Sequence, residues 1–291
     1  MTERLLAIIV PVFAVVALGY AWGRRVRPDM AVVNRLSMNV LAPALIFSAL
    51  SSKSFDVADN ALLMLGSVGV VLGSGLLSWP IARWIREDAR TFVPPMMFNN
   101  CGNMGLPLAV LAFGEAGFPA MVALFTIINL IQFTLGTWLV DRNARFGSLA
   151  RNPMVLSTLA GFAFAIFHPP LPEVAAVTIK LVGDALIPMM LLSLGVRLTG
   201  IRWADARLGA IGGAVCPLTG LAMAAILAPL LGLDARQAGL LFLFGCLPPA
   251  VLNFMVAEQF RREPAKVASM VLIGNLMSVI FVPIGLALAL R

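Results

Sequence analysis

Ten apolar stretches, each about 20 residues long, follow one another along this chain with only short connections between them. About 20 consecutive apolar residues are what an α-helix needs to cross a lipid bilayer. The composition agrees, because 60% of the residues are hydrophobic and 12% are charged, whereas soluble domains carry about 25% charged residues. The sequence therefore excludes a soluble fold and predicts an all-α integral membrane protein with ten transmembrane helices. The expected spans, numbered 1 to 10, are 5–23, 32–51, 61–82, 92–113, 120–140, 153–168, 174–196, 207–231, 238–257 and 267–290.

Basic residues concentrate in the connections that follow the odd-numbered spans. Each of these five connections carries three, and Arg35 at the start of span 2 brings the total to sixteen of the 21 Lys and Arg residues. Because cytoplasmic loops carry the excess of basic residues, these connections are expected in the cytoplasm and both termini outside. The net charge of +7 then reflects membrane topology and does not indicate a nucleic-acid partner. The fifteen basic residues of these five connections are Arg24, Arg25, Arg27, Arg83, Arg86, Arg90, Arg142, Arg145, Arg151, Arg197, Arg202, Arg207, Arg261, Arg262 and Lys266. The five on the opposite side are Arg4, Lys53, Lys180, Arg236 and Arg291.

The chain matches itself when it is shifted by 145 residues. Asn39 to Pro43 then falls on Asp184 to Pro188, Cys101 on Cys246, and Pro119 on Pro264. Chance similarity between apolar sequences is the alternative, but prolines and polar residues match as well. We therefore expect two repeats, 1–145 and 146–291. Each contains five spans, an odd number, so the second repeat must cross the membrane in the opposite orientation, as in many secondary transporters.

Helix-breaking residues cluster at related places in the two halves. Span 4 contains the run 99–107 with three Asn, and span 9 contains the run 245–253 with two adjacent Pro. Irregular backbone at membrane depth survives only where protein or a water-filled cavity surrounds it, and paired breaks indicate a transporter's binding site. The alternative is that these prolines only kink packed helices. The predicted crossover or hinge residues are Gly102, Gly105, Pro107, Pro248 and Pro249.

The breaks predict an anion site. Each second half-helix would begin near the midplane, where its free N–H groups and partial positive charge favour an anion, although no Lys or Arg is expected at mid-membrane depth. Asn100, Asn103 and Asn253 are candidates for hydrogen bonds to this ligand.

The acid Asp184 lies well inside span 7 and is a candidate proton or cation site. The alternative is a carboxyl group that bonds a neighbouring helix, because its repeat partner is the non-titrating Asn39, itself a candidate substrate-binding residue. The three Cys have no paired spacing, so neither a disulfide, a metal site nor a cofactor is expected.

Several motifs, in order along nearly the whole chain, resemble the auxin efflux carrier family, which includes bacterial carriers of malonate and other small carboxylates and the plant auxin exporters. They are Val10-Pro-Val-Phe, Asn34-Arg35 with Ala42-Pro43, Asn100 to Pro107, Arg151-Asn-Pro153, Asp184 with Ser193-Leu-Gly195, and Leu247-Pro248.

The resemblance implies a fold like that of bile-acid symporters and sodium–proton antiporters. Spans 1, 2, 6 and 7 would form a scaffold, and spans 3–5 and 8–10 a transport bundle that moves like an elevator. Asn100 would contact the substrate, Pro107 and Pro248 would open the crossover, and Ala42 and Val251 would line its apolar side. A bacterial inner membrane is the implied location. The sequence leaves open whether the protein forms a homodimer.

Two departures from the plant carriers matter. They have a proline where this chain has Asn253, and an ionisable pair on helix 3, whereas 61–82 contains no charge. The substrate contacts and the coupling ion, H⁺ or Na⁺, therefore stay open.

Transport of a small organic anion, a carboxylate such as malonate or an auxin-like acid, is the leading hypothesis. A sodium-coupled symporter of the bile-acid type is the alternative within transport. A channel is a further alternative. A membrane-embedded enzyme is disfavoured, because the spans contain neither a His-Glu-x-x-His motif nor a Ser–His pair.

Overall fold

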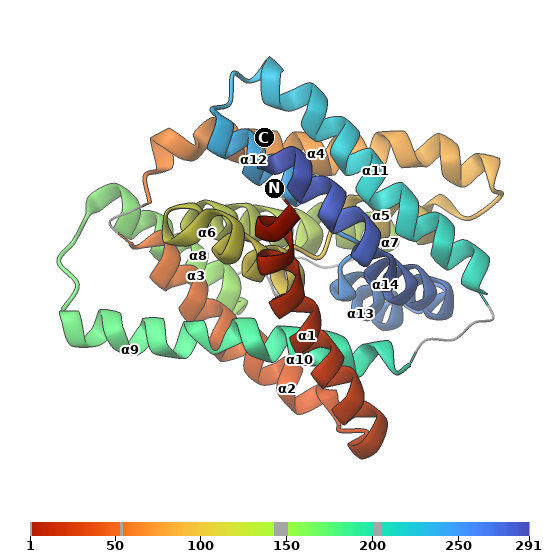
Figure 1. Cartoon of the computed structure of the whole chain (residues 1–291), viewed down its shortest axis with the longest axis horizontal. Coiled ribbons are helices and arrows are strands. Elements are labelled where there is room, and N and C mark those ends of the chain that lie inside the picture. The colour runs from red at the N-terminus through yellow and green to blue at the C-terminus, as the bar shows by residue number, and fades with distance from the viewer. Residues whose placement is uncertain (1, 53–54, 143–150, 201–204, 291) are drawn as a thin grey trace.

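Helices account for nearly all of the described chain, as Figure 1 shows. The computed structural model describes residues 2–52, 55–142, 151–200 and 205–290. The prediction of an all-α membrane protein is confirmed at this level. The elements are α1 (Thr2–Val26), α2 (Met30–Leu36), α3 (Ala42–Leu50), α4 (Val57–Trp84), α5 (Ala89–Met97), α6 (Leu106–Ile131), α7 (Thr137–Val140), α8 (Pro153–Phe167), α9 (Glu173–Asp184), α10 (Leu186–Leu198), α11 (Ala206–Leu230), α12 (Ala235–Gly245), α13 (Val251–Gln259) and α14 (Pro264–Ala289), with the π-helical turns η1 (Ser37–Leu41), η2 (Cys101–Gly105) and η3 (Gln132–Gly136).

Within these ranges, seven helical segments are long and apolar enough to cross a membrane: Thr2–Val26, Met30–Leu50, Val57–Trp84, Gly117–Val140, Glu173–Leu198, Ala206–Leu230 and Pro264–Ala289. The other three expected spans take another form. Span 6 corresponds to α8, which has only 15 residues. Spans 4 and 9 are each divided into two shorter helices, with the gaps at 98–100 and 246–250. Both gaps fall within or beside the runs of helix-breaking residues.

Polar side chains fix where several helices begin. The carboxylate of Asp56 accepts the backbone N–H groups of Ala58 and Asp59, and Asp88 and Asp234 cap α5 and α12 in the same way. Such a side chain satisfies N–H groups that have no partner inside the helix. Helix α4 therefore begins four residues before the expected span, because hydropathy marks only its apolar part.

Helices α1 and α10 pack backbone to backbone. A Cβ atom at Gly195 would overlap the carbonyl of Val16, and one at Gly19 would overlap the carbonyl of Leu192. Small residues allow such close approach between helices in membranes, where dispersion contacts and not the hydrophobic effect hold helices together.

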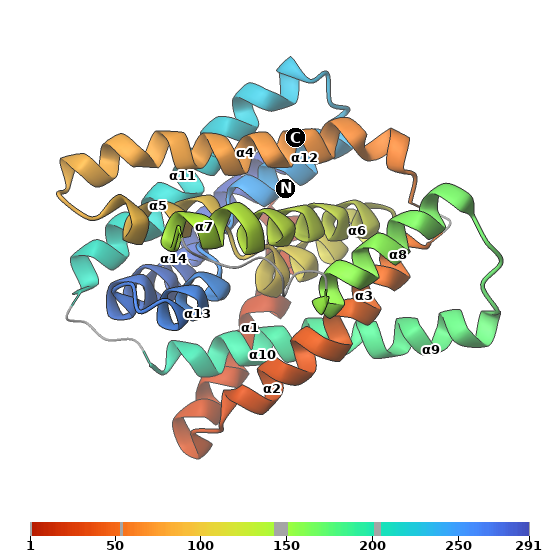
Figure 2. The same ribbon diagram turned by 180° about the vertical axis from the view of Figure 1, so that it is seen from behind.

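Two further groups of helices pack together. Helix α3 packs on α8 and α9, and α11 packs on α4, α12 and α14. Figures 1 and 2 show α9 and α10 along one edge of the molecule and α4 and α11 along the opposite edge, with α6 between them. The two gaps in the helices are brought together between these edges.

Two of the connections lie on opposite sides of the molecule. In Figure 1 the turn between α4 and α5 lies at the right, and the connection between α8 and α9 lies at the left. The boundary between the expected repeats, at 145 and 146, lies outside the described residues, as do Lys53, Arg145, Arg202 and Arg291.

Candidate functional site

The two helix gaps cross and pair with each other. Asn99 forms an isolated antiparallel bridge with Pro249. The backbone N–H of Asn100 donates to the carbonyl of Pro248 at 2.7 Å, and the N–H of Ala250 donates to the carbonyl of Phe98 at 2.9 Å. Each extended segment therefore satisfies backbone groups of the other, which apolar surroundings require.

These two hydrogen bonds also give the local register of the two halves. They relate Asn100 to Ala250 and Phe98 to Pro248, an offset of 150 residues. The offset of 145 inferred from the sequence, which pairs Cys101 with Cys246, does not describe this crossing. Helix α12 has 11 residues where α5 has 9, and its gap is longer as well. In the structural register Asn103 corresponds to Asn253.

Asn253 ties the crossing to a third helix. Its Nδ2 donates to the carbonyl of Phe98 at 2.8 Å and to that of Ala250 at 3.1 Å. Its Oδ1 accepts a hydrogen bond of 2.9 Å from Nε2 of Gln132, which lies in η3. Asn253 is buried. Because these bonds use both the oxygen and the nitrogen of its amide, the side chain holds the extended segments in place.

Asn100 makes the corresponding link on the other side. Its Nδ2 donates to Oδ1 of Asn275 in α14 at 2.7 Å, and Asn275 in turn donates to the carbonyl of Pro249 at 3.0 Å. Neither Asn275 nor Gln132 was singled out from the sequence as a site residue. One sequence signal could have found Asn275: a shift of 145 residues places Asn129 at position 274, directly before it.

The helices that start at the crossing have no side-chain caps. The segment that begins at Cys101 and continues into α6 has none at Asn100, and α13 has none at Ala250. The first N–H groups of a helix have no acceptor within the helix. These ends therefore present donors and partial positive charge, whereas α5 and α12 begin at capping aspartates.

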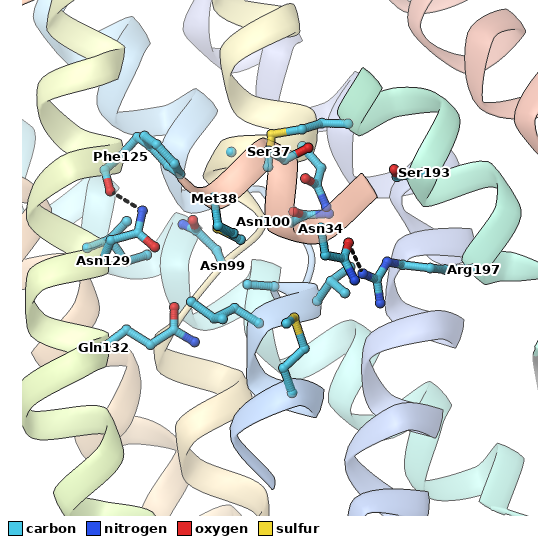
Figure 3. Close-up of a pocket in the computed structure, with 18 residues that line it drawn as sticks. Asn34, Ser37, Met38, Asn99, Asn100, Phe125, Asn129, Gln132, Ser193 and Arg197 are labelled. Atoms are coloured by element: carbon cyan, nitrogen blue, oxygen red, sulfur yellow. Dashed lines mark hydrogen bonds between the residues drawn. The ribbon is translucent and has the colours of Figure 1, made fainter. Parts of the chain in front are cut away.

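A cavity of about 60 Å³ adjoins the crossing. Figure 3 shows its walls, which come from α2, η1, η2, α6, η3, α10, α13 and the two helix gaps. A water molecule needs roughly 10–15 Å³ by this measure, so the cavity has room for several waters or part of a small ligand. It is lined by Asn34, Ser37, Met38, Asn99, Asn100, Gly102, Asn103, Phe125, Ile128, Asn129, Gln132, Met190, Ser193, Arg197, Ala250, Val251, Leu252 and Met255.

Arg197 is the one charged residue among the described residues that line this cavity. It lies in the last turn of α10, and its Nη2 donates to Oδ1 of Asn34 at 2.6 Å, as Figure 3 shows. The sequence analysis assigned Arg197 to the connection after span 7 and did not single it out as a site residue. Because the long side chain of arginine carries its charge several ångströms from the backbone, a residue in the last turn of a helix can line the cavity.

The predicted site residues divide into two sets. Asn100, Gly102, Asn103 and Val251 line the cavity, and Asn253 is buried in the crossing beside them. The side chain of Asn103 makes no hydrogen bond with another described residue, so its amide group is available to a ligand. Of the other hinge candidates, Pro248 and Pro249 lie in the second gap, whereas Gly105 lies in η2 and Pro107 in the first turn of α6.

Three further candidates do not line the cavity either. Asn39 is exposed, and Ala42 is fully buried elsewhere. Asp184 is also exposed, and its carboxylate forms an ion pair of 2.8 Å with Lys180, one helical turn earlier. Its role as a proton or cation site stays a prediction. The described residues contain no cluster of three or more His, Cys, Asp or Glu that would hold a metal.

Known proteins resemble the chain over almost its full length. The model of a family described as "Membrane transport protein" matches it twice, at residues 5–147 and 144–286, which indicates an internal repeat. A Rhizobium meliloti protein named "Putative malonate transporter" is 27% identical, over 94% of this chain and 92% of that protein. An "Uncharacterized transporter" of Methanothermobacter thermautotrophicus is 24% identical, over 97% of this chain and 96% of its own.

Proposed function

Since the chain belongs to the membrane transport protein family, that of the auxin efflux carriers, we propose that it is a secondary transporter or facilitative carrier of a small organic anion. Membership makes it a transporter and not an enzyme. The anion binds where the two interrupted helices cross.

One observation carries this proposal: positive groups surround a cavity that has no described acid in its wall. The uncapped ends at Cys101 and Val251 point donors toward the crossing, and Arg197 adds a full charge. Preorganised donors of this kind favour an anion most where water is excluded. The neutral amide of Asn103 supplies a further hydrogen bond.

A carboxylate is the anion that best fits these groups. Guanidinium and helix N-termini both bind carboxylates through hydrogen bonds assisted by charge. The name of the Rhizobium meliloti relative points to malonate, and an auxin-like acid would carry the same group. The cavity has room for a small acid only in part, so the transport bundle must shift to admit it.

The architecture that supports this function has ten membrane crossings in two inverted repeats, 1–145 and 146–291. Spans 1, 2, 6 and 7 form a scaffold against which spans 3–5 and 8–10 move like an elevator. The packing of α3 on α8 and α9, and of α11 on α4 and α14, is consistent with this division. The site lies between the two parts, with Arg197 on the scaffold and the crossing on the bundle.

The proposed setting is a bacterial inner membrane with both termini outside. The basic connections then face the cytoplasm, as the positive-inside rule requires.

Counterflow tests the proposal. Purified protein in liposomes loaded with unlabelled malonate should accumulate labelled malonate transiently, whereas protein-free liposomes should not. A channel would give flux without accumulation. Flux without saturation or counterflow would contradict a carrier, and absence of any malonate or other carboxylate flux would contradict the function.

A sodium-coupled symporter is the second candidate. Buried side-chain oxygens without a hydrogen-bond partner among the described residues, Asn99 Oδ1 and Thr126 Oγ1, are of the type that Na⁺ prefers. Uptake that is unchanged when a bulky organic cation replaces sodium would eliminate this candidate, and uptake that requires sodium would establish it.

A further inference from the structure

Arg197 has no counter-ion in the described part of the chain. No described carboxylate lies within ion-pair distance of its guanidinium, and its one hydrogen bond goes to the neutral amide oxygen of Asn34. A partly buried charge without an opposite charge destabilises the protein unless hydrogen bonds or a ligand compensate. A guanidinium has five N–H donors, so most of its donors stay available for an anion.

Arg197 also lies on a wall shared by two cavities. Besides the crossing cavity, it lines a larger one of about 410 Å³, which extends between α10 and the helices α13 and α14 and also has the acid Glu258 in its wall. Val251 lines both cavities as well. A ligand that reaches the crossing through the larger cavity therefore passes the guanidinium on its way.

The two positive features of the site come from different elements. The uncapped helix ends are those of η2 and α13, which begin directly after the two gaps, whereas the side chain of Arg197 extends from α10. A ligand with one carboxylate can satisfy only one of them. A ligand with carboxylates at both ends can engage the helix ends with one group and the guanidinium with the other.

We propose that Arg197 is a specificity-determining residue, whose guanidinium binds a second carboxylate and makes the site select short dicarboxylates over monocarboxylates. This inference rests on the proposed function and deepens it. Asn34 acts as a positioning residue that holds the guanidinium at the cavity in the absence of ligand. Its neutral oxygen gives way to a carboxylate, because hydrogen bonds between two charged groups are roughly twice as strong.

A matched pair of ligands tests the proposal. Malonate and monomethyl malonate share one carboxylate and the same carbon chain, but only malonate has the second charge. The affinity of the purified protein for each is measured from the concentration dependence of its melting temperature, since binding to the folded state raises that temperature. Wild-type protein should bind malonate at least about tenfold more tightly, as expected for one additional charged hydrogen-bonded contact.

Substitution of Arg197 should remove the discrimination. Arg197→Gln is expected to weaken malonate binding on the order of 10- to 100-fold and to change binding of the monoester by less than about threefold. Arg197→Lys should retain part of the preference, because it keeps the charge and loses the forked geometry. Arg207→Gln is the matched control, since Arg207 is exposed at the start of α11 and lines neither cavity.

A second variant keeps Arg197 in place. Asn34→Asp puts a carboxylate oxygen where Asn34 Oδ1 now lies, 2.6 Å from Nη2 of Arg197, so it should compete with the ligand and lower malonate affinity selectively. If Arg197→Gln does not fold, this variant decides the question.

The outcomes separate the inference from the function. Equal loss of malonate and monoester binding in both variants, or a wild-type protein that binds the two ligands equally, would overturn the inference while the anion site stands. A wild-type protein that binds no mono- or dicarboxylate would overturn the proposed function and the inference together.

Discussion

The side chain of Asn100 donates a hydrogen bond of 2.7 Å to Asn275 Oδ1, so that the first helix gap is held by α14, 175 positions later in the chain. Both residues are buried. The bond joins a residue that lines the cavity to one that also holds the carbonyl of Pro249. The shape of the site thus depends on side-chain amides outside the crossing itself.

Asn100→Ala should abolish malonate uptake in proteoliposomes and also lower stability. The change leaves Asn275 Oδ1 buried without its donor, which costs about 1–3 kcal/mol. Asn103→Ala is the comparison, because Asn103 lines the same cavity with a free amide; it should weaken ligand binding without lowering the melting temperature. Wild-type uptake by a well-expressed Asn100→Ala protein would rule out its assignment to the site.

Gln132→Met should destabilise the crossing while it preserves side-chain volume. The Oδ1 of Asn253 loses its 2.9 Å hydrogen bond from Gln132, and we expect a loss of about 1–3 kcal/mol for the unpaired buried group. The measurement is the midpoint of chemical denaturation in detergent. Thr134→Val serves as control, since Thr134 is exposed and bonds only to carbonyls of its own helix. Equal midpoints for the two variants would show that Gln132 does not support Asn253.

Stability should fall at acid pH through Glu263, which lies in the turn between α13 and α14. Hydrogen bonds from Lys266 and from buried Thr91 lower the pKa of this carboxyl below its ordinary value. Because the folded-state pKa lies below the unfolded value of about 4.3, the contribution is complete above that value and is lost as the pH falls through the folded-state pKa.

Melting temperatures measured between about pH 6 and pH 3 check this prediction. Glu263→Gln should be less stable than wild type at the higher pH and should lose less on acidification. Glu173→Gln is the control, because Glu173 is exposed at the start of α9 and forms no described ion pair. Parallel curves for wild type and Glu263→Gln would refute the role of this carboxyl.

Gly195→Ala should separate α1 from α10. The added methyl group would overlap the carbonyl of Val16, and backbone cannot move aside as a side chain can, so we expect a loss of roughly 1–3 kcal/mol. At Gly69 a methyl group would meet only the end of the Leu227 side chain, at 2.7 Å. Gly69→Ala should therefore cost less, and thermal unfolding in detergent compares the two. The reverse order would contradict tight packing at Gly195.

The native thiols allow a direct test of orientation, because Cys101, Cys216 and Cys246 are all buried. A membrane-impermeant maleimide should leave wild-type protein in intact cells unlabelled. Glu173→Cys should be labelled in intact cells, and Gln259→Cys only after permeabilisation, since both positions are exposed and lie in connections of opposite expected side. The opposite pattern would invert the proposed topology.

Hydropathy and helix breakers predicted much of the fold. Every expected span overlaps one or more helices, and the gaps at 98–100 and 246–250 fall at or next to the predicted breaks. The register of the crossing could not be predicted, because α12 and its gap are longer than their counterparts and local length changes are invisible in a single offset. The backbone hydrogen bonds alone therefore show that Asn103 and Asn253 occupy equivalent positions in the two halves.

The charge in the cavity escaped prediction for a different reason. A hydropathy window ends where a charged residue begins, so Arg197 was assigned to the connection just beyond span 7. Its side chain, however, points back to Asn34. Asp184 shows the converse: a charge inside a span drew attention, although Lys180 four residues earlier already indicated an ion pair along one helix face.

The pairing of Asn100 with Pro248 and of Ala250 with Phe98 has a consequence for how the chain is made. Ribosomes add about 5–20 residues per second, so the roughly 150 residues between the partners take about 8 to 30 s to synthesise. During that interval the first half occupies the membrane with polar backbone groups that lack their final partners. Water or other protein must supply hydrogen-bond partners for the first gap until the second half is made, because unpaired backbone groups are costly in lipid.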